Sequence, residues 1–265
     1  MLYCQKIKII DQSNKQPISY AIVMIDSTGS YANKNGQFKI PNKRVDHIKV
    51  KHIAYYDLTI NKIPENDTLF LKPKPQVLDQ VIVGGYDDLK RKRLRSRSKV
   101  EDHFYEGLEI VSCYCPKKDL KGYITNLLFD SYLERKDEKL NGTSVLRINT
   151  YNNNDLKSGK LKKSYKPKKI KFTHKTDEIS FNIKNQPIIL DKNGFCLGLE
   201  VIELNSKDDG KISSVISHKN RFFKVKSYYK FNLDGKREMV TFREYNRDFE
   251  FSGIEKGYFM PEMTL

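Results

Sequence analysis

The sequence predicts an all-β protein made of two β-sandwich domains that are joined by a basic linker. Three observations predict this class. Short stretches of alternating apolar and polar residues recur along the chain, and turn-forming residues such as Asn-Gly separate them. No long stretch repeats its apolar residues with the period of a helix. The 265 residues are enough for two domains that each bury a core.

The first part of the chain contains short stretches that are expected to be strands. They cover residues 5–10, 18–26, 37–40, 47–55, 56–63 and 67–73. Pro17 fixes φ and lacks a backbone donor, so it suits the entrance to a strand. Residues 27–36 are rich in turn formers and end in Asn35-Gly36, a strong hairpin signal. These features predict sheet and turns here, without a ligand site.

Four stretches of this part carry a family resemblance: KIKIIDQSNKQPISYAIVMI, GSYANKNGQFKI, IKVKHIAYYDLTI and LFLKPKPQVLDQVIV. Together they resemble the carboxypeptidase regulatory-like domain, a transthyretin-like β-sandwich common in envelope proteins of Bacteroidetes. Ala54-Tyr55 replaces the usual Gly-Tyr of that family, and Asp79-Gln80 replaces its usual acidic pair. The resemblance implies a non-catalytic domain over residues 1–84, with a transthyretin/Ig-like fold.

A basic block, LKRKRLRSRSK, follows at residues 89–99 and contains no acidic residue. Such a block repels itself, so residues 85–103 are expected to form a solvated linker. Two other interpretations are contact with an anionic polymer or lipid, and a nuclear-localisation-like or RNA-binding arm. The candidate anion contacts in this block are Lys90, Arg91, Lys92, Arg93, Arg95 and Arg97.

Residues 104–265 contain a second series of expected strands, separated by turns such as DKNG and NLDG. Residues 122–135 fit either a strand or a short helix. The stretches SVLRINTY, EISFNIKNQPIILDKNGFCLGLEVIEL and SYYKFNLDGKREMV resemble the second half of Bacteroidetes proteins that carry the regulatory-like domain in front. This resemblance covers residues 105–250. It implies a second, jelly-roll-like β-sandwich without an assigned activity.

Glu200 lies within an apolar stretch, GFCLGLEVI. A carboxylate in such surroundings invites a catalytic or calcium-binding interpretation. Alternation places Glu200 on one face with Gly198 and Ile202, and Arg147 lies on another expected strand. The favoured interpretation is a structural pair of Glu200 and Arg147, with a ligand contact and catalysis as alternatives.

A second lysine-rich stretch, residues 157–175, holds nine lysines and no acidic residue. Lysines on an edge strand prevent edge-to-edge aggregation, which is the favoured interpretation. The alternative is an anion-contact surface. Its candidate residues are Lys162, Lys163, Lys168 and Lys169.

The cysteines and histidines give no sign of a metal or cofactor site. Cys113 and Cys115 form C-x-C, unlike the C-x-x-C of zinc ribbons. On a strand both would share one face and act as small buried hydrophobic side chains. Whether these two residues are free thiols is left open. The five histidines lie far apart, and the chain contains no H-E-x-x-H, P-loop or G-x-S-x-G motif. We therefore expect no metal, no cofactor and no enzymatic activity.

The formal net charge of +16 favours an anionic partner. The first functional hypothesis is a non-enzymatic cell-envelope binding or scaffold protein with a glycan, peptide or envelope-protein partner. The alternative is a cytoplasmic nucleic-acid-binding protein that uses residues 89–99 and 157–175. The start MLYCQKIKII lacks the features of a signal peptide, which predicts a cytoplasmic protein. If a leader is missing from this chain, the protein is expected in the periplasm or at the outer membrane. No transmembrane segment is expected.

Overall fold

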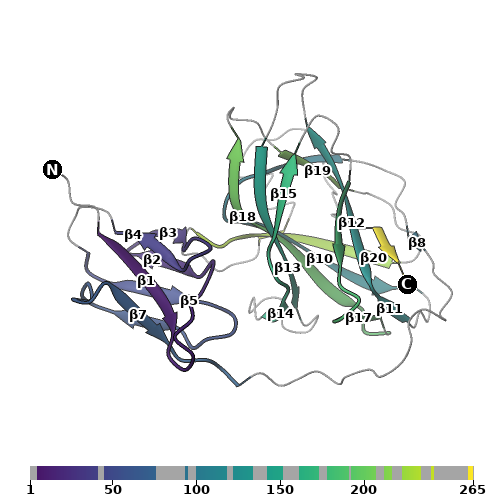
Figure 1. The fold of residues 1–265 in the computed structure, drawn as a ribbon. Coiled ribbons are helices and arrows are strands. Elements are labelled where there is room, and N and C mark those ends of the chain that lie inside the picture. The colour runs from purple at the N-terminus through teal and green to yellow at the C-terminus, as the bar shows by residue number, and fades with distance from the viewer. Residues whose placement is uncertain are drawn as a thin grey trace. The chain divides into compact units, whose positions relative to one another are not determined.

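A computed structural model gives the structure of the chain (Figure 1). The residues that it describes are 5–40, 45–75, 93–94, 100–117, 122–133, 142–151, 161–172, 178–190, 192–206, 212–216, 223–233, 240–241 and 262–264. Their regular structure is entirely β, as the sequence predicts. The chain divides into two compact units. The N-terminal unit comprises Met1–Val83 with Phe231–Arg237, and the C-terminal unit comprises Gly84–Lys230 with Glu238–Leu265.

The N-terminal unit contains two small sheets. In the first, the strand order is β4-β1-β7, and in the second it is β3-β2-β5-β6. The strands are β1 (Lys6–Asp11), β2 (Ile22–Ile25), β3 (Thr28–Tyr31), β4 (Gln37–Lys39), β5 (Ile48–Lys51), β6 (Leu58–Ile60) and β7 (Thr68–Leu71). Alternation along β1 and β5 buries every second side chain, as expected for strands with one face on a core.

The stretch 18–26 differs from the single strand that its apolar run predicts. Ile18 still hydrogen-bonds to Ile9 of β1, but Tyr20 adopts a φ of +57° and regular pairing resumes at Ile22 in the other sheet. The chain therefore changes sheets at Tyr20. An apolar run cannot reveal this change, because both halves of the run face one core.

The segment 27–36 contains a strand where its composition predicts a turn. β2 and β3 form a hairpin in which Ile25 pairs with Thr28, so the connection is Asp26-Ser27, with Asp26 at a φ of +53°. The expected Asn35-Gly36 turn is present just before β4. Gly36 has a φ of +71°, and a Cβ there would lie 2.7 Å from the carbonyl oxygen of Ile9. Glycine is required at position 36 for both reasons.

The core of the N-terminal unit is apolar and collects side chains from both sheets. Its buried members are Ile7, Ile9, Ile18, Ala21, Val23, Ile25, Ala32, Phe38, Ile40, Ile48, Val50, Leu69 and Leu71. Burial of aliphatic side chains of this size stabilises the fold by about 1.5–3 kcal/mol each. This core is the main source of stability in the unit.

The C-terminal unit is built on longer strands. Its larger sheet has the order β14-β13-β18-β10-β20-β21, with β15 also paired to β13. The strands of this sheet are β10 (Leu108–Pro116), β13 (Gly142–Tyr151), β14 (Leu161–Ser164), β15 (Lys168–Phe172), β18 (Phe195–Ser206), β20 (Phe223–Phe231) and β21 (Val240–Thr241).

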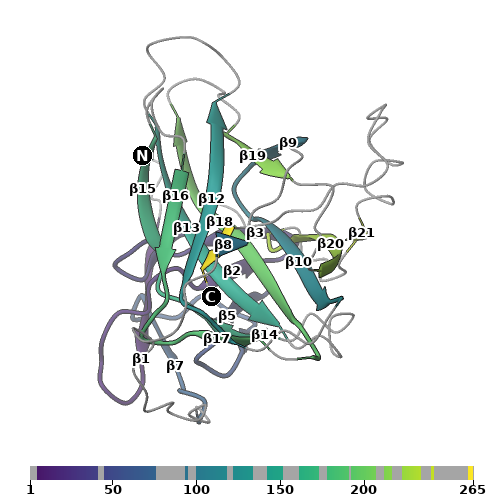
Figure 2. The ribbon, with the colours of Figure 1, turned by 90° about the vertical axis from the view of Figure 1, so that its right-hand side faces the viewer.

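A second sheet has the order β8-β22-β12-β19-β9, with β16 paired to β12, and β11 pairs with β17. These strands are β8 (Arg93–Leu94), β9 (Val100–Phe104), β11 (Gly122–Ile124), β12 (Asn126–Leu133), β16 (Glu178–Asn182), β17 (Ile188–Leu190), β19 (Ile212–Ile216) and β22 (Glu262–Thr264). Figure 2 shows β12 and β16 side by side with their arrows pointing in opposite directions, as their antiparallel pairing requires. Residues 122–135, which fit a strand or a helix, thus form β11 and β12 as far as they are described.

Parts of the expected linker 85–103 are strands of this second sheet. Arg93 pairs with Thr264, and Val100 pairs with Ile216. Charge repulsion within the basic block does not prevent the pairing of Arg93, because strand pairing is made by backbone hydrogen bonds. Among the described residues, none lies in a helix long and apolar enough to cross a membrane.

Candidate functional site

One face of the larger sheet in the C-terminal unit gathers buried charged side chains. Strand register places Glu109 of β10 opposite Glu200 of β18, and Arg147 of β13 opposite the same Glu200. Lys230 of β20 reaches this group as well. The four side chains belong to residues that are at most 9% exposed. Burial of ions is costly unless each one is paired, so their partners decide what the group can do.

Each carboxylate has a cation of its own. Arg147 donates from Nε to Glu200 Oε2 at 2.8 Å and from Nη2 to Oε1 at 2.9 Å. Lys230 Nζ lies 3.0 Å from Glu109 Oε2. The Arg147–Glu200 pair expected from the sequence is therefore present as a two-pronged ion pair. The four groups carry two positive and two negative charges.

Two neutral side chains join the ion pairs into one network. The Asn149 Nδ2 group donates to Glu109 Oε1 and to Glu200 Oε2, both at 2.8 Å. The Tyr151 hydroxyl donates to Glu109 Oε1 at 2.5 Å and accepts from Lys230 Nζ at 3.0 Å. Asn149 Oδ1 in turn accepts from the Ser164 hydroxyl. We call Glu109, Arg147, Asn149, Tyr151, Glu200 and Lys230 the buried ion network.

The network holds Tyr151 as a neutral phenol. Burial, and then the nearby charge of Glu109, raise the pKa of Tyr151 well above its ordinary value. Because the phenol keeps its proton, it can donate to the carboxylate rather than repel it. In this network the charges balance and the buried polar groups bind one another. Such a network makes a core rigid and favours one arrangement of its strands.

Gly198 makes room for this network. A Cβ at position 198 would overlap Glu109 Oε1 and lie 3.1 Å from the Tyr151 ring. Gly198 pairs with Val111 on one side and with Asn149 on the other, so it lies in the middle of the sheet. A glycine inside a strand often marks such a close approach.

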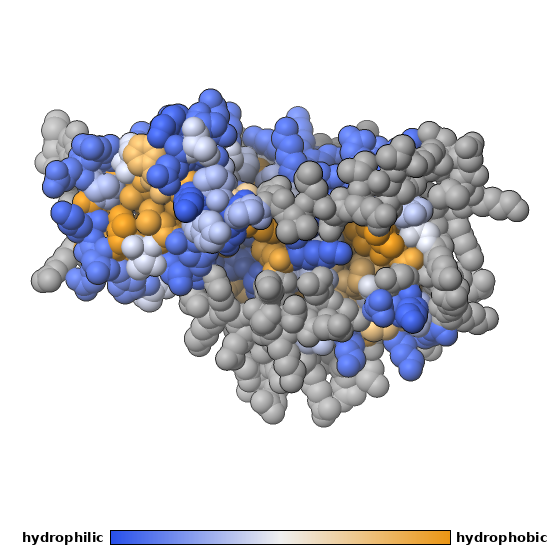
Figure 3. Space-filling model, turned by 90° about the horizontal axis from the view of Figure 1, so that it is seen from below, coloured by the Kyte–Doolittle hydropathy of each residue, from blue (hydrophilic) through white to orange (hydrophobic). Residues whose placement is uncertain are grey.

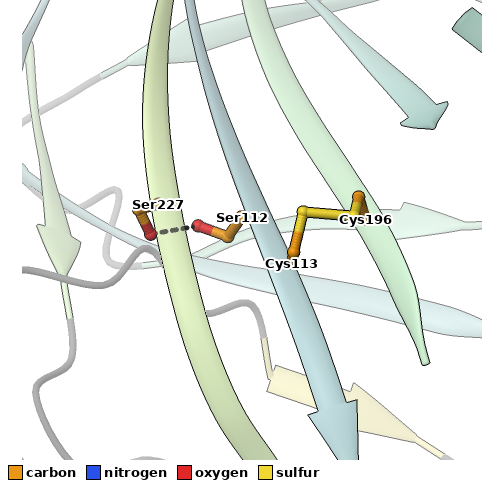
Figure 4. Close-up of a disulfide and its surroundings, with 4 residues drawn as sticks. All are labelled: Ser112, Cys113, Cys196 and Ser227. Atoms are coloured by element: carbon orange, nitrogen blue, oxygen red, sulfur yellow. Dashed lines mark hydrogen bonds between the residues drawn. A yellow bond between two sulfur atoms is a disulfide. The ribbon is translucent and has the colours of Figure 1, made fainter. Parts of the chain in front are cut away.

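The same face of the sheet carries a disulfide between Cys113 of β10 and Cys196 of β18 (Figure 4). The two residues are directly paired in the register, with 4.0 Å between their Cα atoms. Both are buried beside Val111 and Tyr151. Cys113 is buried, as the sequence predicts, and its thiol state, which the sequence leaves open, is a disulfide because Cys196 lies directly opposite it. Cys115 is half-buried and lies outside the disulfide.

The opposite face of β10 has a different character. In Figure 4, Cys113 points from β10 toward β18, whereas Ser112 lies on the side of β10 that faces β20. The hydroxyls of Ser112 and Ser227 are 2.6 Å apart. Tyr114 stacks on Phe195 with 4.9 Å between ring centroids and meets Phe223 edge-on. This face is aromatic and packs as a core.

A second polar centre lies in the N-terminal unit at Asp11, where β1 ends. Asp11 Oδ1 accepts from the backbone and the hydroxyl of Ser13, at 2.7 and 2.6 Å, while Oδ2 accepts from the Tyr55 hydroxyl at 2.7 Å. These hydrogen bonds, first of all that from the Ser13 hydroxyl, lower the pKa of Asp11 to about 2. Burial and the same contact raise the pKa of Tyr55 to about 12. Asp11 thus fixes the turn after β1 against the segment at Tyr55.

The structure places some of the predicted anion contacts on strands. Lys162, Lys168 and Lys169 are exposed on β14 and β15, which both pair with β13. Lys163 is half-buried, with its ammonium 5.4 Å from the centroid of the Tyr165 ring. Arg93 belongs to β8. The other candidates of the basic block, Lys90, Arg91, Lys92, Arg95 and Arg97, lie outside the described residues.

Sequence reasoning missed Glu109, Asn149, Tyr151 and Lys230. A signal for two of them is the spacing in RINTY, where Arg147, Asn149 and Tyr151 alternate and so share one strand face. In the described part of the chain, no group of three or more histidines, cysteines, aspartates and glutamates could hold a metal ion. No family model matches this chain, and neither does the sequence of any curated protein.

Proposed function

We propose that the protein is a non-enzymatic binding or scaffold protein of the cell envelope. The observation that carries this proposal is the buried disulfide between Cys113 and Cys196. Disulfides persist in oxidising compartments such as the periplasm and the cell surface, and they are rare in the cytosol. A disulfide at a directly paired position of two central strands is thus matched to export.

The buried ion network supports a structural rather than a catalytic use of the charged residues. A general acid or base must reach a substrate proton, and a nucleophile must reach its target atom. Glu109 and Glu200 are fully buried, and their oxygens already bind cations and donors of the protein. Saturated groups of this kind stabilise one register of the sheet. This is the property that a scaffold needs.

The finer fold is also part of the proposal. The N-terminal unit, with two small sheets around an apolar core, is compatible with a transthyretin-like sandwich of the carboxypeptidase regulatory-like type. The C-terminal unit has two larger sheets of antiparallel pairs, which is compatible with a jelly-roll-like sandwich. The resemblance of the sequence to Bacteroidetes envelope proteins supports the same assignment.

The proposal is tested in cells that express the native gene. Fractionation is combined with a maleimide-polymer gel shift, before and after reduction, to count reactive thiols. The expected result is a periplasmic or outer-membrane protein in which Cys113 and Cys196 react after reduction and unfolding but not before reduction. A cytosolic protein in which both thiols react without reduction would overturn the envelope proposal.

The second candidate function is nucleic-acid binding, which the exposed lysines of β14 and β15 favour. Binding through phosphates weakens steeply as salt rises, because each contact releases counterions. The measurement is the affinity for duplex and single-stranded oligonucleotides across a salt series, with Lys162, Lys168 and Lys169 changed to Gln in one variant. This candidate requires a steep salt slope that becomes shallower by about 2–3 in the variant. Equal slopes would remove it.

A further inference from the structure

The N-terminal unit presents two exposed aromatic rings on neighbouring segments. Tyr56 and Phe70 are each 47% exposed. The backbone N–H of Tyr56 donates to the carbonyl of Lys72 at 2.9 Å, and Lys72 follows Phe70 by two residues. Because Phe70 and Lys72 are exposed and Leu71 between them is buried, the two exposed side chains share one face of the chain. Tyr56 therefore lies beside the strand that carries Phe70.

Three lysines accompany these rings. The Lys15 ammonium lies 4.9 Å from the centroid of the Phe70 ring, and those of Lys72 and Lys74 each lie 5.9 Å from the centroid of the Tyr56 ring. None of the carboxylates in the described ranges forms an ion pair with these lysines. Within the described residues, the surface therefore carries three ammonium groups without a carboxylate partner, next to exposed rings. In Figure 3, apolar residues (orange) break the hydrophilic surface (blue) of this unit, at the left of the view.

Asp11 holds the two sides of this surface in place. Its backbone carbonyl accepts from the N–H of Lys15 at 3.0 Å, and its carboxylate fixes Ser13 in the same turn. The other carboxylate oxygen binds the hydroxyl of Tyr55, which precedes Tyr56. Segments that are already fixed by the same buried carboxylate lose little conformational entropy when a ligand binds to the side chains they carry.

We propose that this surface, built from Lys15, Tyr56, Phe70, Lys72 and Lys74, binds a glycan that carries carboxylate groups. We call it the ring-lysine surface. The rings would pack against the C–H faces of sugar rings, and the ammonium groups would bind the sugar carboxylates. The inference rests on the proposed envelope function, and it adds a ligand class and a location to it.

Charge and shape favour this ligand over other anions. An anionic lipid surface is bound by a continuous apolar face that inserts at the level of the headgroups. The surface here instead has two separate exposed rings with ammonium groups over them. A nucleic acid would supply phosphates and bases, but the disulfide matches the protein to a compartment in which glycans are the abundant anionic polymers. The alternation of flat rings with point charges fits a polymer that repeats a sugar face and a carboxylate.

The test measures binding of the full-length oxidised protein to polygalacturonate by calorimetry at low and at physiological salt. The matched ligand is the same polymer with its carboxylates methyl-esterified, which keeps the sugar faces and removes the charge. Chondroitin sulfate serves as a second uronate-containing glycan. A single-stranded oligonucleotide of similar charge serves as the competing ligand class.

Two variants change the ring-lysine surface. One carries Tyr56→Ala and Phe70→Ala, and the other carries Lys15→Gln, Lys72→Gln and Lys74→Gln. The matched charge control carries Lys34→Gln, Lys39→Gln and Lys62→Gln, which removes three exposed lysines from the same unit. The matched ring control is Tyr105→Ala, at an aromatic residue that is 40% exposed in the C-terminal unit. Thermal unfolding of each variant shows that it is folded.

The proposal expects both surface variants to bind either acidic glycan at least about tenfold more weakly, while both controls bind within about twofold of the parent protein. The esterified polymer should bind at least about tenfold more weakly than the acid form. Equal losses in the surface and control lysine variants would overturn it, as would a lack of binding to both acidic glycans. Tighter binding of the oligonucleotide through the same five residues would also overturn it. Fractionation of the native protein decides the envelope function separately, so either proposal can fail while the other stands.

Discussion

The two units of the molecule bury polar groups in opposite ways. In the N-terminal unit the core is apolar, and the buried carboxylate of Asp11 lies at the end of a strand and binds neutral donors. In the C-terminal unit, Glu109 and Glu200 lie in the middle of a sheet and bind Lys230 and Arg147. The first unit keeps charge at the margin of its core, whereas the second distributes balanced charge across the centre of a sheet.

This difference shows two ways to fix the register of a sheet. Along β1 and β5, apolar and polar residues alternate, so a one-residue slip would turn the apolar side chains to solvent. Along β13, residues Val145 to Tyr151 are all buried, on both faces of the strand. A one-residue slip would therefore leave the same side chains buried, and loss of burial would not oppose it. The pair Arg147–Glu200 distinguishes the native register of β13 against β18, and the disulfide Cys113–Cys196 does the same for β10 against β18. The buried ion network and the disulfide therefore replace alternation as the source of specificity.

The largest effect is expected from removal of the disulfide. Changing Cys113 and Cys196 to Ala releases a loop with a sequence separation of 83 residues. Loss of this constraint on the unfolded chain should lower the free energy of unfolding of the C-terminal unit by about 4.5 kcal/mol. Urea unfolding, followed through NMR methyl signals of Ile148 for this unit and Ile9 for the other, measures the change. Equal shifts of both signals would show that the two units do not differ in this respect.

Removal of one cation from the network should have the next largest effect. Arg147→Met leaves Glu200 buried without its ion pair and should cost about 3–5 kcal/mol, seen at the Ile148 methyl signal. The matched control adds Glu200→Leu to the same protein. This double variant should recover most of the loss, because an apolar pair replaces the ion pair. If the double variant is as unstable as Arg147→Met, the loss of stability does not come from leaving Glu200 without its cation, and the prediction is wrong.

The close approach at Gly198 predicts a smaller effect. Gly198→Ala places a methyl group against the Glu109 carboxylate and the Tyr151 ring. The resulting displacement should cost roughly 2 kcal/mol in the free energy of unfolding of the C-terminal unit. Urea unfolding of this variant would contradict the prediction if its midpoint equalled that of the parent protein.

The smallest effect is expected at Asp11 and depends on pH. Its pKa is about 2 in the folded protein, against 3.8 for an ordinary aspartate. Because folding lowers this pKa, the carboxylate stabilises the N-terminal unit above about pH 4, and the stabilisation disappears as the pH falls toward 2. Asp11→Asn should therefore lower the urea midpoint of the Ile9 methyl signal at pH 6 but not at pH 2. Glu65→Gln, at an exposed carboxylate, is the control and should not show this pH-dependent difference.

Much of the N-terminal unit could be predicted from the sequence, because its structure follows local rules. Alternation located β1, β5, β6 and β7, and Asn35-Gly36 located the turn before β4. The change of sheets at Tyr20 could not be predicted, since it depends on a non-glycine residue with positive φ inside an apolar run. The two-residue turn at Asp26-Ser27 could not be predicted either, because it too depends on a non-glycine residue, Asp26, with positive φ.

The site in the C-terminal unit was predictable in one part. Glu200 and Arg147 stand out as charges within apolar stretches, so their pairing could be expected. Glu109 and Lys230 also have apolar or aromatic neighbours in the sequence, but the partners that allow their burial depend on which strands become neighbours. The partner of Cys113 depends on the same information, since Cys196 is brought opposite it by the β10–β18 register.

The disulfide also determines what a protease can do to the chain. Cys113 and Cys196 enclose the nine lysines of residues 157–175, eight of which are sites for a trypsin-like enzyme; Lys166 is not, because Pro167 follows it. A single cut at any of them would leave two fragments that remain covalently joined across β10 and β18. Such a nicked protein would migrate as one species until it is reduced, and only then separate into two. In an environment rich in proteases, the molecule could lose the continuity of its chain and still keep its central strands together.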